Sequence, residues 1–309
     1  MTPAIVVRDL VKRYGDLVAV NGVSFEVGDG EFFGILGPNG AGKTTTLEMI
    51  EGLREPDSGT VEILGQSPYP RNSALLSRIG VQLQASAFFE RLTAREQIST
   101  FAALYDLPST RSDELLEMVG LTDKAGTRTE KLSGGQAQRL AIACALIQDP
   151  QVVFLDEPSA ALDPQARRNL WEVLREINSR GKTVVLTTHY MDEAENLCDR
   201  VAIMDAGEIL RLGPPAELVR GLDAPVRISV EHGMLSEPAA RQMLADLPGA
   251  DVDRPDTVEE DISSIIITTT RPSPVLSELA ARDALAGLQV RGATLEDVFL
   301  DLTGREYRA

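Results

Sequence analysis

Cysteine, histidine and long apolar runs are scarce in this chain. Its 309 residues include two cysteines, Cys144 and Cys198, and two histidines, His189 and His232. The cysteines lie far apart, with no CxxC pair and no histidine nearby at metal-ligand spacing, which argues against a disulfide framework or a zinc site. No stretch approaches the roughly 18 consecutive apolar residues that span a bilayer, and the first residues do not resemble a signal peptide. We therefore expect reduced thiols and a cytoplasmic protein.

Positive charge is scarce as well. The chain has 30 lysines and arginines against 47 acidic residues, a formal net charge of -17. Nucleic acid and anionic membrane surfaces are both negatively charged, so this balance argues against general affinity for either. A phosphate site must then be built from backbone N–H groups and a few placed cations. The length suits one large domain and a smaller second one.

Short apolar runs alternate with helical patterns from Ile5 to about Gly207. Four runs are rich in β-branched residues and suit strands buried on both faces of a mostly parallel sheet: 32–36, 152–155, 183–186 and 201–204. A helical pattern over 165–180 follows Asp163-Pro164, an N-terminal helix signal. The segments 4–8, 18–27 and 59–64 alternate instead, which predicts an antiparallel edge region.

Residues 85–146 show helical patterns (94–104, 112–119 and 135–147) and no convincing strand, which indicates a helical insertion in an α/β core. After the turn at 213–215 the pattern changes. From Pro225 it predicts strand 226–230, helix 238–247, a weak strand near Val252, strand 262–270, helix 274–285 and strand 288–291. That βαββαβ order is compatible with a small ferredoxin-like module.

The segment Gly37-Pro38-Asn39-Gly40-Ala41-Gly42-Lys43-Thr44 fits the P-loop pattern G-x-x-x-x-G-K-[ST]. It follows an apolar strand and opens a helix, which is the context that the pattern requires. The glycines let successive N–H groups point at phosphate oxygens, and the helix adds its positive end. Lys43 would neutralise the β- and γ-phosphates, and Thr44 would offer its hydroxyl to Mg²⁺. The sequence thus predicts a site for ATP and Mg²⁺.

The buried strand 152–155 ends in two carboxylates, Asp156 and Glu157. Because side chains alternate along a strand, we expect the two to point in opposite directions and to have different roles. Asp156 suits the surroundings of Mg²⁺, and Glu157 suits orienting and polarising the attacking water. An apolar strand that ends in acids is common and usually marks only a strand edge. The preceding P-loop is what indicates a role in ATP hydrolysis for these two acids.

The motif Leu132-Ser133-Gly134-Gly135-Gln136 distinguishes among P-loop proteins. It begins a predicted helix, with Ser133 as its cap. Here the chain resembles the nucleotide-binding subunits of ATP-binding-cassette (ABC) proteins, whose signature is LSGGQ. The resemblance covers roughly residues 4–222. It implies an α/β P-loop NTPase cassette with a mostly parallel core sheet, an antiparallel β edge region and a helical subdomain at about 85–148. We predict a nucleotide-binding domain over 1–222 and an accessory α+β domain, ferredoxin-like, over 223–309.

The resemblance implies roles for further positions. Tyr14 matches the aromatic residue that stacks on adenine, the alternative being a core tyrosine of an edge strand. Gln84 matches the Q-loop glutamine that contacts Mg²⁺, with Gln82 as a rival, and His189 matches the switch histidine that senses the γ-phosphate. The implied nucleotide-binding residues are Tyr14, Gly37, Asn39, Gly40, Gly42, Lys43, Thr44, Thr45, Gln84, Ser133, Gly135, Gln136 and Asp163. Lys43, Glu157 and His189 are implied as catalytic, and Thr44, Gln84 and Asp156 as metal-binding.

Three positions depart from the family pattern. Ala161 replaces the usual glycine of the D-loop, Leu83 replaces the proline before the Q-loop glutamine, and Cys144 replaces an arginine common after the signature helix. None of these changes removes a catalytic group. His232 has no motif around it, and we expect an exposed strand residue.

The signature implies partners. In the family, the signature of one protomer covers the ATP held by the P-loop of another, so that two ATP molecules are buried in a head-to-tail dimer. A homodimer of this chain would contain two complete sites. A transport role also requires a separate permease, received at residues 85–105, which would hold the protein at the cytoplasmic face of the membrane.

The C-terminal segment 293–306 resembles the ending of drug- and antibiotic-exporting ATPase subunits of the daunorubicin-resistance type. The residues alone predict only an amphipathic terminal helix. The resemblance favours an exporter subunit with a drug-like, antibiotic-like or lipophilic cargo. The rival is a soluble ABC ATPase acting on ribosomes or DNA, but such proteins usually carry two cassettes, a long coiled-coil insertion or zinc-binding cysteines. An importer subunit is a more distant alternative.

Overall fold

A computed structural model describes residues 3–84, 88–222, 225–248 and 255–304. The chain forms two compact units, Met1–Pro215 and Ala216–Glu306. Each unit has its own sheets and its own cluster of buried apolar side chains.

The first unit is built on a six-stranded sheet in the order β5-β6-β7-β3-β8-β9. Its strands are Ile79–Gln82 (β5), Val152–Asp156 (β6), Thr183–Thr188 (β7), Phe32–Leu36 (β3), Arg200–Asp205 (β8) and Glu208–Gly213 (β9). The first five in this order run parallel, and β9 pairs antiparallel with β8. Because β3, β6 and β7 are buried along their whole length, their sequences are continuous apolar runs. The predicted parallel core is confirmed.

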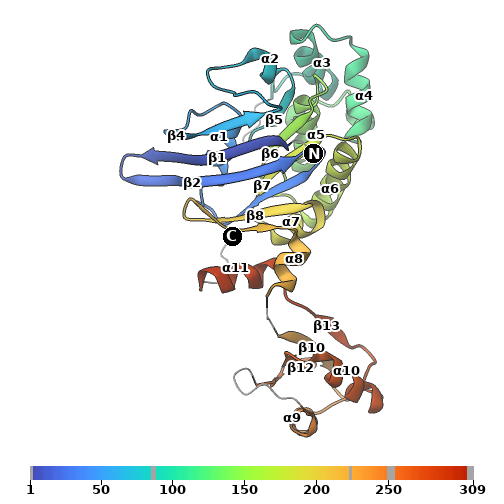
Figure 1. Cartoon of the computed structure of the whole chain (residues 1–309). Coiled ribbons are helices and arrows are strands. Elements are labelled where there is room, and N and C mark those ends of the chain that lie inside the picture. The colour runs from blue at the N-terminus through green and yellow to red at the C-terminus, as the bar shows by residue number, and fades with distance from the viewer. Residues whose placement is uncertain (1–2, 85–87, 223–224, 249–254, 305–309) are drawn as a thin grey trace. The chain divides into compact units, whose positions relative to one another are not determined.

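A second sheet of the same unit is antiparallel, with the order β2-β1-β4. It consists of Pro3–Tyr14 (β1), Leu17–Gly28 (β2) and Ser58–Ile63 (β4), which confirms the predicted edge region. Helix α1 (Lys43–Ile50) packs between the two sheets, against β1, β2 and β4 on one side and β6 and β7 on the other (Figure 1). The short helix α2 (Ser73–Leu76) precedes β5.

The described residues 88–146 contain helices and no strand, as predicted. They form α3 (Ala94–Leu104), α4 (Thr110–Met118), α5 (Gly134–Ala145) and the 3₁₀ turns Thr122–Lys124 (η1) and Thr129–Lys131 (η2). Capping boxes begin α3 at Thr93 and α5 at Ser133, where each cap exchanges hydrogen bonds with the residue three positions on. Helices α6 (Pro164–Ser179) and α7 (Met191–Leu197) alternate with the later strands of the parallel sheet.

The second unit has the βαββαβ order that the sequence predicts. Its elements are β10 (Val226–Glu231), α9 (Glu237–Asp246), β11 (Thr257–Glu260), β12 (Ser264–Thr269), α10 (Pro272–Ala281) and β13 (Gln289–Arg291), flanked by α8 (Pro215–Arg220) and α11 (Leu295–Thr303). The strands form an antiparallel sheet in the order β11-β12-β10-β13, as in a ferredoxin-like fold. The weak strand predicted near Val252 lies outside the described residues.

Candidate functional site

The loop between β3 and α1 passes so close to neighbouring strands that two of its positions must be glycine. A Cβ atom on Gly37 would lie 2.2 Å from the carbonyl oxygen of Met204, and one on Gly42 would lie 2.4 Å from that of Ala19. Gly42 also has a φ of 99°, a conformation that disfavours any side chain. The strands β2 and β8 therefore hold the loop against the N-terminus of α1.

The N-terminus of α1 has no side-chain cap, because its N-cap residue is Gly42. Its first N–H groups keep their hydrogen-bonding capacity and their positive end for an anion. The adjacent Lys43 is only 4% exposed, and its Nζ donates to the carbonyl oxygens of Gly37 at 2.9 Å and Pro38 at 3.1 Å. A buried cation beside an uncapped helix end fits the phosphates of a nucleotide.

Asp156 ends β6 and accepts two hydroxyl hydrogen bonds at one oxygen. Its Oδ1 lies 3.1 Å from Thr44 Oγ1 and 2.5 Å from Thr187 Oγ1. Burial raises the pKa of the Asp156 carboxyl above its ordinary value, although both hydrogen bonds act in the opposite direction. Hydroxyl and carboxylate oxygens are the ligands that Mg²⁺ prefers, so the Thr44 and Asp156 pair fits a magnesium ion, whose charge would favour ionised Asp156.

Glu157 follows β6 in a left-handed backbone conformation, with a φ of 46°. Its Oε1 lies 3.2 Å from Lys43 Nζ and its Oε2 lies 3.1 Å from His189 Nδ1. The prediction that Asp156 and Glu157 point in opposite directions is wrong. The strand ends at Asp156, and the left-handed turn brings Glu157 back to the same site, where it contacts a different set of groups.

The signature motif and Asp163, the last residue of the D-loop (159–163), line a separate hollow of about 230 Å³. Ser133 and Gln136 exchange capping hydrogen bonds at the start of α5, and Asp163 caps α6 by accepting from two backbone N–H groups, each at 2.9 Å. Gly135 lines the same hollow. Within the described ranges, no hydrogen bond or ion pair joins these residues to Lys43, Asp156 or Glu157.

Other positions implied by the resemblance lie at the surface. Tyr14 is 42% exposed at the end of β1, with the Arg54 guanidinium 5.4 Å from its ring centroid, so the alternative of a core tyrosine is wrong. Gln84 is exposed, whereas its rival Gln82 is 2% exposed and donates to the Leu83 carbonyl oxygen at 2.5 Å. In the P-loop, Asn39 and Gly40 are exposed and Thr45 is half-buried in the first turn of α1.

A groove of about 540 Å³ lies beside α3, α5 and β5. Leu83 and Cys144, two of the departures from the family pattern, both line it, and so does Glu51. Burial raises the pKa of the Cys144 thiol to about 12 and that of Glu51 to about 9, so both groups are neutral at pH 7. Neither cysteine forms a disulfide, which confirms the expected free thiols.

Two polar residues near the P-loop cluster were not predicted from the sequence. Thr187 donates to Asp156 and accepts from the Glu157 N–H at 3.0 Å, because β7 pairs with β6 and sets Thr187 opposite Asp156. The available signal was the pair of threonines that closes β7, the strand after the one that ends in Asp156. Glu193 of α7 is fully buried and accepts from Trp171 Nε1 of α6 at 3.1 Å. Burial raises the pKa of Glu193.

A profile of the ABC transporter family matches residues 20–160. Proteins named Nod factor export ATP-binding protein I resemble the chain over almost its whole length. The protein of Burkholderia orbicola (strain AU 1054) is 41% identical over 303 residues, which covers 97% of this chain and 96% of the relative. The protein of Ralstonia nicotianae (strain ATCC BAA-1114 / GMI1000) is 40% identical over 319 residues, covering 99% and 96%. The chain belongs to the ABC transporter family.

Solved ABC proteins share its cassette fold. The structure of cbiO1 from Clostridium perfringens, part of the ABC transporter complex cbiONQ, has a TM-score of 0.66 and 28% identity and covers 80% of this chain and 97% of its own. A dimeric ATP-binding cassette in a post-hydrolysis state, bound to ADP and Pi, has a TM-score of 0.61 and 30% identity and covers 68% and 98%. The predicted fold and the predicted ATPase activity are confirmed, so the chain is an ABC ATPase that binds nucleotide. Its described part contains no helix long and apolar enough to cross a membrane.

Proposed function

We propose that this ABC ATPase energises an exporter through a separately encoded membrane permease, working as a homodimer at the cytoplasmic face of the cell membrane. The proposal rests on the cluster of Lys43, Glu157 and the partly buried His189 beside the Thr44 and Asp156 pair, which provides for phosphate, water and metal in one site. The name of the relatives, Nod factor export ATP-binding protein I, supports export as the direction.

ATP would bind with its phosphates at the P-loop and its adenine on the exposed ring of Tyr14. Thr44 and Asp156 would hold Mg²⁺, with Gln84 as a further ligand. Bound Mg²⁺ would neutralise charge on the transferred phosphate. Lys43 contacts both the Gly37 carbonyl oxygen of the phosphate loop and Glu157 Oε1. A phosphate that binds Lys43 in place of Glu157 would leave this Glu157 oxygen for a water molecule. His189 holds the other Glu157 oxygen and orients the carboxylate.

The signature hollow supports the homodimer. Ser133, Gly135, Gln136 and Asp163 line one hollow at the starts of α5 and α6, yet none is bonded to the P-loop cluster within the described ranges. In a head-to-tail dimer they would cover the ATP held by the other copy. A similar cassette is dimeric in its ADP- and Pi-bound state, which supports a dimer.

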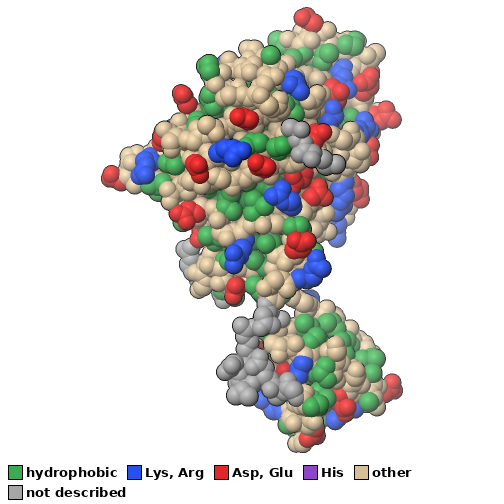
Figure 2. Space-filling view, in the orientation of Figure 1, with side chains coloured by type: hydrophobic (Ala, Val, Ile, Leu, Met, Phe, Trp, Pro, Cys, Tyr) green, Lys and Arg blue, Asp and Glu red, His purple; other side chains and the backbone are tan. Residues whose placement is uncertain are grey.

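The groove beside α3 and α5 is the proposed dock for the permease. Its lining includes the exposed Leu83 together with Phe101 and Tyr105, which suit an apolar helix face. We assign residues 1–222 to the nucleotide-binding domain, with its helical subdomain at about 85–148, and residues 223–309 to an accessory domain. The proposed cargo is drug-like, antibiotic-like or lipophilic. Basic side chains are interspersed with acidic ones on the face seen in Figure 2, which supports the absence of a nucleic-acid partner.

The test uses tagged, full-length Glu157→Gln protein, which should retain ATP and stay dimeric. Expressed in its native host, held with Mg-ATP and crosslinked, it should co-purify with a polytopic membrane protein that has no cassette of its own. The Glu157→Gln protein with the additional change Leu83→Glu, in the proposed dock, should no longer co-purify with that membrane protein. Recovery of ribosomes or DNA with nothing from the membrane would overturn the exporter and leave the ATPase chemistry intact. ATP-dependent uptake of a lipophilic dye by inverted vesicles would then test the cargo class.

A further inference from the structure

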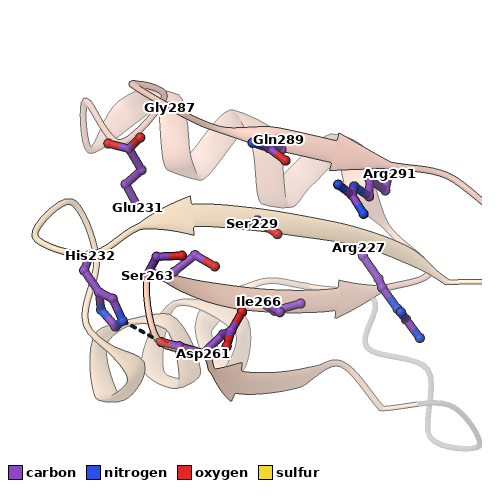
Figure 3. A pocket seen from close by; sticks show the side chains of 11 residues that line it. Arg227, Ser229, Glu231, His232, Asp261, Ser263, Ile266, Gly287, Gln289 and Arg291 are labelled. Atoms are coloured by element: carbon purple, nitrogen blue, oxygen red, sulfur yellow. Dashed lines mark hydrogen bonds between the residues drawn. The ribbon is translucent and has the colours of Figure 1, made fainter. Parts of the chain in front are cut away.

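One face of the sheet in the second unit is packed and the other is open. Helices α9 and α10 cover the packed face, where Met243 and Leu279 bury Ile228 and Ile267 in one apolar cluster. The open face forms a hollow of about 580 Å³ (Figure 3). In the hollow its middle row consists of Ser229 with its register partners Ile266 and Gln289, and the row continues onto β11 at Glu259.

Charge in this hollow is separated by sign, and the acid Glu259 of β11 lies on the same face outside the hollow's lining. Arg227 and Arg291 are register partners on β10 and β13 and lie at one end (Figure 3). Two cations side by side repel each other, and neither guanidinium has an ion pair within the described ranges. The other end carries Glu231 and Asp261.

At the acidic end, a hydrogen bond to the backbone and a glycine help to place the acidic residues. His232, which follows β10 rather than lying in a strand as expected, is exposed, and its Nε2 lies 2.7 Å from the Asp261 carbonyl oxygen. Gly287 has a φ of +66°, and a Cβ there would lie 2.3 Å from the Glu231 carboxyl carbon, so glycine leaves room for this side chain. Glu231 and Asp261 therefore lie at the opposite end of the hollow from the two arginines.

A two-fold axis through the middle row would place the basic end of one open face on the acidic end of an identical face. Such an arrangement is self-complementary, as an isologous contact must be. We propose that the open face docks on the open face of a second copy of this chain. Arg227 and Arg291 of each copy then meet the acidic end of the other, and the short Ser229 side chain at the centre lets the faces approach.

The small area of the face determines the condition under which this contact is stable. Four strands of three to six residues, about 4.8 Å apart, cover roughly 300 Å², less than half of the ~800 Å² that each partner contributes to a standard interface. Exposed ion pairs are also individually weak. The contact therefore needs the high effective concentration of a tethered pair. It rests on the proposed ATP-bound homodimer, which would supply that tether.

The exposed tip beside the acidic end adds an apolar contact. Ile262, between β11 and β12, is 98% exposed, an extreme for a large aliphatic side chain. In the two-fold arrangement this tip meets the basic end of the other copy, where the arginine stems offer apolar surface.

The test is disulfide trapping in the full-length chain with Glu157→Gln and Cys144→Ser. Ser229→Cys lies next to the proposed two-fold axis, and Gln242→Cys, exposed on α9 over the packed face, is the matched control. With Mg-ATP and a mild oxidant, Ser229→Cys should form a covalent dimer at least about tenfold faster than Gln242→Cys. Without ATP, both should react at the same slow rate. Arg291→Glu should slow the Ser229→Cys reaction, and adding Glu231→Arg should restore it, because the swapped charges pair again.

Sedimentation of the same samples separates the two proposals. A stable ATP-bound dimer in which Ser229→Cys reacts no faster than the control would overturn the docking and leave the proposed function standing. The absence of any ATP-bound dimer would refute the homodimer, and the docking with it. Capture of a membrane protein by Ser229→Cys in place of a second copy would also overturn the docking.

Discussion

The P-loop half and the signature half of the cassette differ in how their polar groups are satisfied. Lys43, Asp156 and Glu157 are buried, and each is bound by another side chain of the cluster. Around the signature, Ser133 and Gln136 cap only their own helix, and a hollow remains beside them. A set of buried, mutually bound charges is ready to act on a phosphate, whereas, among the described residues, the signature residues bind only groups of their own helix. The difference supports the proposed homodimer, in which a second copy would complete the site.

Glu157→Gln would remove the proposed catalytic carboxylate from the P-loop half without changing its shape. We expect ATP turnover to fall by about a hundredfold to a thousandfold, because the amide cannot take a proton from water. ATP affinity should hardly change. Steady-state phosphate release measures the first quantity and equilibrium nucleotide binding the second. Asp192→Asn is the control, since Asp192 is exposed and pairs with Arg167. Persistent hydrolysis in Glu157→Gln would remove Glu157 from its assigned role.

Glu51 is the exception in the P-loop half, because its Oε1 has no hydrogen-bond partner among the described residues. Burial raises its pKa from 4.5 to about 9, so the folded protein keeps a proton that the unfolded chain releases. This contribution to stability is complete below pH 4.5 and is lost as pH rises through about 9. We expect Glu51→Gln to raise the unfolding free energy by about 3 kcal/mol at pH 7.

The pH profile of urea denaturation checks this prediction. The free energy of unfolding should fall with pH between about 5 and 9 in the unmodified chain, and this slope should flatten in Glu51→Gln. Glu62→Gln, at an exposed position of β4, should leave the slope unchanged. An unchanged slope in Glu51→Gln would mean that Glu51 is ionised, and would place a cation or water beside it.

Lys43→Ala would test the phosphate contact of the same half. Loss of one charged hydrogen-bond donor costs about 1.5–3 kcal/mol, so we expect ATP to bind about tenfold to a hundredfold more weakly. Lys182→Ala, which breaks a surface ion pair with Asp149, is the control and should leave affinity unchanged. Titration with a fluorescent ATP analogue measures both. Equal affinities would contradict the P-loop assignment.

How much of this site the sequence predicts depends on how local each feature is. The P-loop, the acids after β6 and the βαββαβ order are local patterns, so they were predictable. The turn that redirects Glu157 was not, because a positive φ at a glutamate follows from its surroundings. Thr187 was missed for a related reason, since its contact with Asp156 depends on the pairing of β6 with β7. The charge separation on the open face likewise requires the register of β10 with β13.

In the signature half, Gly135 and Gly134 make a matched pair of probes. A Cβ on Gly135 would lie 2.9 Å from Ala166 Cβ of α6, whereas one on Gly134 would meet only Leu162 Cδ2, at 3.8 Å. We expect Gly135→Ala to lower the unfolding free energy by about 1–2 kcal/mol through overpacking. Gly134→Ala should be neutral or stabilising by up to about 1 kcal/mol, because alanine favours helix. Similar denaturation midpoints for both would show that α5 and α6 do not constrain the signature.

Ala161, one of the departures from the family pattern, gives the smallest expected effect. It occupies the position of the usual D-loop glycine and has a φ of 58°, so an alanine bears the left-handed conformation there. That conformation costs a residue with a Cβ roughly 1–2 kcal/mol. A glycine would avoid this cost, but its greater freedom in the unfolded chain would offset part of the gain in stability. We expect Ala161→Gly to raise the unfolding free energy by about 0.5–1 kcal/mol in thermal denaturation. A matched Ala160→Gly change, at a neighbour without a positive φ, should instead lower it. If Ala161→Gly is also destabilising, the D-loop does not hold the left-handed turn in solution, and the signature half is less ordered than the P-loop half.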